Sequence, residues 1–149
     1  MGFLDKLKNK PQLPTALPPH MAFLVCVFWI AGIDQNIPDE EKTALERVQG
    51  KLPGSGPDDI QEVVRLFQTW GEANVDMDAV RNLCKNSLNM DQRLFAIANM
   101  IEIAMADGTI QDEEQKAIED FVTAFEVDSN AVEKIVEVMG IKNNFNAFA

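Results

Sequence analysis

The sequence has few of the residues on which histidine catalysis and disulfide scaffolds depend. Its 149 residues include one histidine, His20, two cysteines, Cys26 and Cys84, and no tyrosine. Two cysteines this far apart, outside any C-x-x-C motif, exclude a disulfide framework and are typical of a reducing cytosol. The single histidine excludes most catalytic mechanisms that rely on imidazole groups.

Basic residues are also scarce. The chain has 13 Lys and Arg against 24 Asp and Glu, which gives a formal net charge of −11. Proteins that bind nucleic acid draw their affinity from cations that neutralise phosphates, and anionic membranes likewise attract basic surfaces. The composition therefore argues against nucleic acid as a partner and against adhesion of the domain to an anionic membrane.

A long hydrophobic run is missing as well. The apolar run Met21–Ile33 has 13 residues, whereas a membrane-spanning helix needs about 20. Three lysines in Gly2–Lys10 precede the run, which gives it some likeness to a secretory signal, but four prolines separate the two features. We interpret the run as a buried helix, with no direct insertion into a membrane, and the protein as cytoplasmic.

Apolar residues recur at helical spacing along the chain, and no segment alternates in the way of a strand. We therefore predict a single all-α domain, a compact bundle of about seven or eight helices over residues 1–149. Leu52–Pro57 is predicted to be a linker between two halves. After the apolar run, one helix is predicted to begin at Asp58 or Asp59 and to end at Gly71. The next three are predicted over Asp76–Leu88, Asp91–Met105 and Gln111–Phe125. A last helix is predicted to be capped by Asp128 and to end at Gly140.

The chain contains an internal repeat. An offset of 73 residues aligns Ile30–Glu41 with Ile103–Glu114, and seven of the paired positions are identical. Each copy contains an apolar helix, a short D-x-x-I turn whose isoleucine (Ile37 or Ile110) faces the core, and a new helix opened by D-E-E. The match extends over about residues 20–50 and 93–123, which predicts a bundle built from two similar halves.

The negative charge is concentrated in the same two places. Residues 34–48 carry five acids and two bases, and residues 102–120 carry seven acids and one base, so the two segments hold −9 of the net −11. A structural interpretation is sufficient for both turns. Asn36 or Thr109 would cap the following helix, with Asp39 or Asp112 three residues on. Each carboxylate at a helix N-terminus adds about 0.3–1 kcal/mol.

A metal-binding interpretation stays open beside it. The second copy, D-G-x-I-x-x-x-E, matches the latter half of an EF-hand loop, but Ile103 and Met105 stand at the first and third ligand positions. An ordinary EF-hand is therefore excluded. If the two halves pack about a pseudo-twofold axis, the two turns together can hold a weakly bound hard cation such as calcium, magnesium or manganese. The candidate ligands are Asp34, Asp39, Glu41, Asp107, Asp112 and Glu114.

The doubled A-x-x-D-x-x-I-x-D-E-E block, the opening G-F-L-D-K-L-K and the chain length resemble the TerB family of tellurite-resistance proteins. The resemblance implies a bundle of about seven helices, a bacterial or phage context, and a role in resistance to tellurite and related stresses. It also implies a metal-binding acidic surface and a link to a membrane protein of the same system. Gln35 replaces the glycine of the first turn and Pro38 follows, so we expect the second turn to be the better formed. The implied acidic surface consists of Asp34, Asp39, Glu40, Glu41, Asp107, Asp112, Glu113 and Glu114.

The function expected from these features is that of a non-enzymatic adaptor or scaffold of a resistance system, acting through its acidic surface. It would be cytoplasmic, or peripheral at the inner face of the membrane. One alternative is a weakly membrane-associated module using Gly2–Lys10, although we expect that segment to be a short helix packed on the bundle. Another is a thiol-dependent enzyme on tellurite, for which Cys26 and Cys84 would be the reactive groups.

Overall fold

The computed structural model describes residues 13–32, 39–106 and 110–148, and within these ranges the chain is all-helical with no strand. The segment Gly2–Lys10 lies outside the described residues. The elements are α2 (Pro19–Ala31), α3 (Asp39–Lys51), α4 (Asp59–Glu72), α5 (Met77–Ser87), α6 (Met90–Ala104), α7 (Asp112–Phe125), α8 (Ser129–Lys142) and the 3₁₀ helix η1 (Phe145–Phe148).

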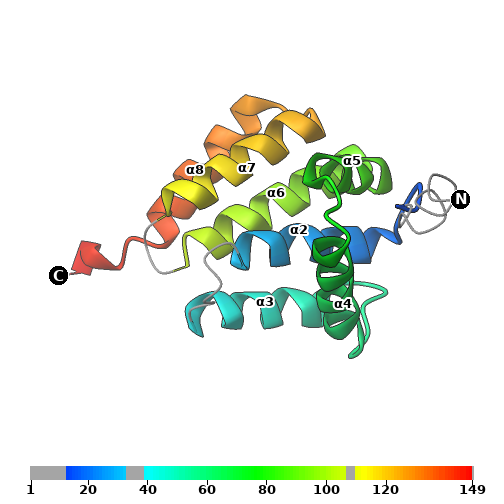
Figure 1. Cartoon of the computed structure of the whole chain (residues 1–149). Helices are drawn as coiled ribbons and strands as arrows, with labels where there is room; N and C mark the ends of the chain where they lie inside the picture. Colours follow the sequence, from blue (N-terminus) through cyan, green and yellow to red (C-terminus); the bar gives the residue numbers. More distant parts are fainter. Residues whose placement is uncertain (1–12, 33–38, 107–109, 149) are drawn as a thin grey trace, which may run out of the picture.

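Helices α2 and α6 form the centre of the bundle (Figure 1). Helix α2 contains no Asp, Glu, Lys or Arg, and it contacts α3, α4, α5, α6 and α7. Because nearly every face of α2 is apolar, it has to be covered on all sides, as the sequence predicts. The buried residues of α2 are Met21, Ala22, Phe23, Leu24, Val25, Cys26, Val27, Ile30 and Ala31.

Helix α6 is the second central helix and makes its largest contact with α2. Ile97, Met100 and Ile103 are fully buried in it. The buried side-chain amide of α6, Asn99, donates from Nδ2 to the carbonyl of Phe95 at 2.9 Å, so its nitrogen has a hydrogen-bond partner inside the core. Helices α7 and α8 pack on α6 from outside.

Side-chain caps begin several helices, and the cap at Asp128 is at the residue that the sequence predicts. Asp76 accepts from the Asp78 amide and Asp128 from the Asn130 amide, both at 3.0 Å. Asn89 and Gln92 form a reciprocal capping box at the start of α6. Asp58 precedes α4 without a side-chain cap.

The predicted helix ends at Gly71 and Gly140 are wrong. Helix α4 continues to Glu72 and α8 to Lys142, because a glycine within a helix weakens it without ending it. The left-handed residues that follow α4 and α7 are instead Asn74 (φ 53°) and Glu126 (φ 56°).

The predicted linker Leu52–Pro57 forms a hydrogen-bonded turn. The Gln49 side-chain amide donates to Ser55 Oγ at 3.1 Å and to the Gly56 carbonyl at 3.2 Å. The Gly56 amide donates to Asp59 Oδ2 at 2.6 Å, which joins the turn to the start of α4. The turn is therefore held at both of its ends.

An aromatic cluster joins α2 to α7. The ring of Phe121 lies edge-on to Trp29 at 4.9 Å and to Phe125 at 5.4 Å between centroids. The Arg81 guanidinium lies over the Trp29 ring at 4.9 Å. Phe121 and Phe125 are both fully buried, so this cluster closes the core between α2, α5 and α7.

Replacing Phe121 by alanine is expected to reduce the free energy of unfolding by about 3–5 kcal/mol, because the change leaves a cavity in the core. Phe148 provides a control with the same chemistry, since its side chain is 97% exposed. Phe148→Ala should change the free energy by no more than about 0.5 kcal/mol. Urea unfolding followed by tryptophan fluorescence measures both, and equal effects would contradict the described core.

Candidate functional site

The two acidic segments of the repeat lie at the starts of α3 and α7. Helix α7 opens with Asp112, Glu113 and Glu114, and helix α3 opens at Asp39. Of the six predicted metal ligands, Asp34 and Asp107 lie outside the described residues. Asp39 and Glu41 lie in α3, of which the structure describes the backbone there, and Asp112 and Glu114 are described in full.

The three acids of α7 do not share one environment. Asp112 and Glu113 are exposed to solvent, whereas the side chain of Glu114 is buried, with 4% of its surface exposed. The Gln111 amide donates to Glu114 Oε1 at 3.2 Å. Glu114 therefore completes the start of the helix, while Asp112 and Glu113 present their charge to solvent beside the positive end of the helix dipole.

The second turn leads into a capped helix, as the sequence predicts, but the capping residues are not the predicted ones. The cap of α7 is Gln111, with Glu114 three residues on, in place of Thr109 with Asp112. Thr109 and Asn36 lie outside the described residues. The apolar residue of this turn, Ile110, packs against the core as the sequence predicts.

The helix ends that flank the two acidic turns lie at the same end of the molecule. Helices α2 and α6 run in the same direction, so Ala31 and Ala104 end them on one side, and α3 and α7 begin on that side as well (Figure 1). This geometry meets the condition that a shared site requires, because turns at opposite ends of the bundle could not bind one cation together. Within the described ranges alone, no three His, Cys, Asp or Glu side chains form a group that could hold a metal ion.

Comparison with models of known protein families shows to which family the chain belongs. The family model for tellurite resistance protein TerB matches residues 20–137, a stretch that runs from α2 into α8 and includes both acidic turns. The chain belongs to the TerB family. No curated protein and no solved structure matches the chain.

In this TerB family member, the two cysteines are buried and lie beside one another. Helix α2 carries Cys26 and helix α5 carries Cys84, and both side chains have no exposed surface. Burial raises the pKa of the Cys26 thiol well above its usual value, and a hydrogen bond with Cys84 raises it further. Cys26 is therefore a neutral thiol at neutral pH, which is the unreactive form.

None of the helices that the structure describes in this TerB protein is both long enough and apolar enough to cross a membrane. This agrees with the interpretation of the run Met21–Ile33 as a buried helix.

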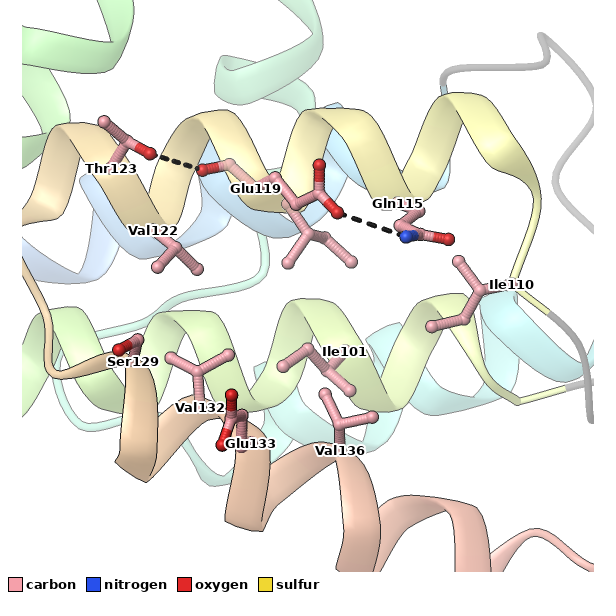
Figure 2. A pocket seen from close by; sticks show the side chains of 11 residues that line it. Ile101, Ile110, Gln115, Glu119, Val122, Thr123, Ser129, Val132, Glu133 and Val136 are labelled. Carbon is pink, nitrogen blue, oxygen red and sulfur yellow. Dashed lines mark hydrogen bonds between the residues drawn. The ribbon is translucent and has the colours of Figure 1, made fainter.

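The sequence did not point to a groove that lies between α7 and α8 (Figure 2). Both helices pack on α6 but make little contact with one another, and Ile101 of α6 lies between them. Val132, Ile135 and Met139 of α8 pack against the core, yet α8 buries no residue fully. Amphipathic spacing alone could not reveal this, because a half-covered helix has the same periodicity as a covered one.

The environment of the thiols predicts their reactivity. Because the raised pKa keeps Cys26 protonated and both sulfur atoms are buried, the folded protein should react with Ellman's reagent far more slowly than a free thiol at about pH 8. Both thiols should react rapidly in concentrated guanidinium chloride. Rapid stoichiometric modification of either thiol in the folded protein would contradict the described burial.

Proposed function

We propose that this TerB family protein acts in tellurite resistance as a non-catalytic adaptor, through an acidic end that binds a hard divalent cation. The observation that carries the proposal is the arrangement of the two acidic helix starts at one end of the bundle (Figure 1). The two central helices α2 and α6 are parallel, so the acidic helices that follow them, α3 and α7, both begin on the same side of the bundle (Figure 1). Repulsion between clustered carboxylates favours a bound cation.

The chemistry of the ligand set favours calcium, magnesium or manganese. Every candidate side chain is a carboxylate, and carboxylate oxygens are the ligands of hard cations. Asp34, Asp39 and Glu41 would come from the first turn and Asp107, Asp112 and Glu114 from the second. Glu114 uses Oε1 to accept the Gln111 amide, so we assign it the role of orienting the second turn, with Asp107 and Asp112 as the principal ligands there.

The adaptor role is supported by what the described side chains offer chemically. The thiols, the groups that a thiol-dependent reaction on tellurite would need, are buried, and Cys26 is neutral at neutral pH. The acidic end, by contrast, presents exposed charge on Asp112 and Glu113. We propose that a protein partner of the resistance system, such as a membrane protein, recognises this end in its cation-bound form.

Calorimetric titration of the purified protein with Mn²⁺, Mg²⁺ or Ca²⁺ tests the cation site. We expect saturable binding that weakens about tenfold or more in Glu41→Gln and in Asp107→Asn, because each change removes a charged ligand. Glu137→Gln, an exposed position of α8, is the control for lost charge and should bind as the parent does. The absence of binding heat, or equal loss in all three variants, would refute the site.

Growth on tellurite tests whether the acidic end or the thiols carry the function. In a host that depends on this protein, Asp107→Asn and Glu41→Gln should lower survival, while the Cys26→Ala, Cys84→Ala double variant should retain it. Circular dichroism of each variant verifies folding. Loss of resistance in a folded double-cysteine variant would instead support the thiol-dependent reaction.

A further inference from the structure

The groove between α7 and α8 has apolar walls along both helices. It has a volume of about 530 Å³, and Ile101 of α6 forms its floor. In Figure 2, Val122 of α7 and Val132 and Val136 of α8 point into the space between the helices. Val136 remains 41% exposed, so the groove leaves apolar surface in water that an occupant would bury.

The charge of the groove has one sign. Glu119 of α7 and Glu133 of α8 stand on opposite walls, and no Lys, Arg or His is among the residues that line it. The Gln115 side-chain amide donates to Glu119 Oε1 at 3.1 Å, which leaves the negative charge of Glu119 in place. An occupant with cationic groups on both sides of an apolar stripe would therefore complement both walls.

The shape of the groove fits a helix. Helices α7 and α8 have 14 residues each, and a helix of that length spans about 21 Å, or four turns. An amphipathic helix that lays its apolar face into a groove between two helices is a recurring mode of recognition. An extended segment could not bind here by adding a strand, because helices α6, α7 and α8 offer no sheet edge.

We propose that this groove is the docking surface for a basic amphipathic helix of the partner protein, with an apolar stripe flanked by Lys and Arg. The proposal rests on the adaptor function, since it names the surface and the partner chemistry that an adaptor requires. The groove is distinct from the acidic turns. Val136 and Glu133 lie on α8, whereas the proposed cation ligands lie in or directly before the first turns of α3 and α7.

A designed peptide tests the proposal without knowledge of the partner. The probe is a fluorescein-labelled helix of about 16 residues, with Leu at positions i, i+3, i+4, i+7 and i+11 and Lys on both sides of that stripe. Two comparison peptides replace every Lys by Glu, or keep the composition and scramble the stripe. Binding to the full-length protein is measured by fluorescence anisotropy at an ionic strength of about 0.15 M.

Matched variants of α8 separate the groove from general attraction to an acidic protein. Val136→Lys places a cation in the groove, and Val138→Lys places the same cation on a side chain that is 57% exposed and does not line it. We expect Val136→Lys to weaken binding of the Lys-flanked peptide at least about tenfold and Val138→Lys to have little effect. Glu133→Gln should weaken binding more than Glu137→Gln does, which gives a second comparison should Val136→Lys fail to fold.

Three results would overturn the proposal. The first is no binding of the Lys-flanked peptide, or binding as tight as that of either comparison peptide. The second is equal weakening by Val136→Lys and Val138→Lys. The third is a parent protein that sediments as a dimer and becomes a monomer only in Val136→Lys, because a second copy of the chain would then occupy the groove.

The same variants distinguish this inference from the proposed function. Val136→Lys should retain the cation binding seen by calorimetry, and Asp107→Asn should retain the peptide binding. A parent protein that binds the cation but not the peptide would therefore refute the docking surface, and a parent protein that binds the peptide but no cation would refute the acidic site.

Discussion

Burial of the uncharged helix α2 is the constraint on which the rest of the structure depends. A helix that is apolar on nearly every face is stable in water only when other helices cover all of it. Helix α6 provides the largest cover, and α3, α4, α5 and α7 provide the rest. Because α2 and α6 run in the same direction, both helices end on the same side of the bundle, where α3 and α7 begin (Figure 1). The acidic end that we propose is thus a consequence of how the core is covered.

Helix α7 connects the two surfaces to which we assign functions. Its first turn carries Asp112 and Glu113 at the acidic end, and its length forms one wall of the groove beside α8. Ile110, which follows the second acidic turn, packs against the core and also lines the groove. One helix therefore extends from the acidic end along the proposed docking surface, and the opposite wall belongs to α8 alone.

The sequence predicted the features that depend on local pattern. The all-helical fold, the burial of helix α2 and the cap at Asp128 followed from apolar spacing and from the preference of short polar residues for helix starts. The TerB resemblance rested on the doubled acidic block and is confirmed by the family match. Helix ends were predicted less well. Glycine was assumed to end α4 and α8. The residues that cap the start of α7 were predicted to be Thr109 and Asp112, whereas they are Gln111 and Glu114.

The features that the sequence could not predict depend on packing between distant segments. Cys26 and Cys84 are adjacent because α2 packs on α5, and nothing near either residue in sequence indicates this contact. The groove exists because α7 and α8 both lie on α6 without closing on one another. The cation site that we propose depends on packing in the same way, since it requires two segments that are far apart in the chain to lie close together.

The central claim is that the two acidic turns bind one cation together. Paramagnetic broadening by Mn²⁺ in amide NMR spectra tests it most directly. With Mn²⁺ at substoichiometric concentration, we predict that amides at the ends of both α2 and α6 broaden together, at the same Mn²⁺ concentration, and that both recover on addition of excess Mg²⁺. Broadening confined to one of these ends, or spread evenly over the exposed acids of α4 and α8, would contradict a cation site shared by the two acidic turns.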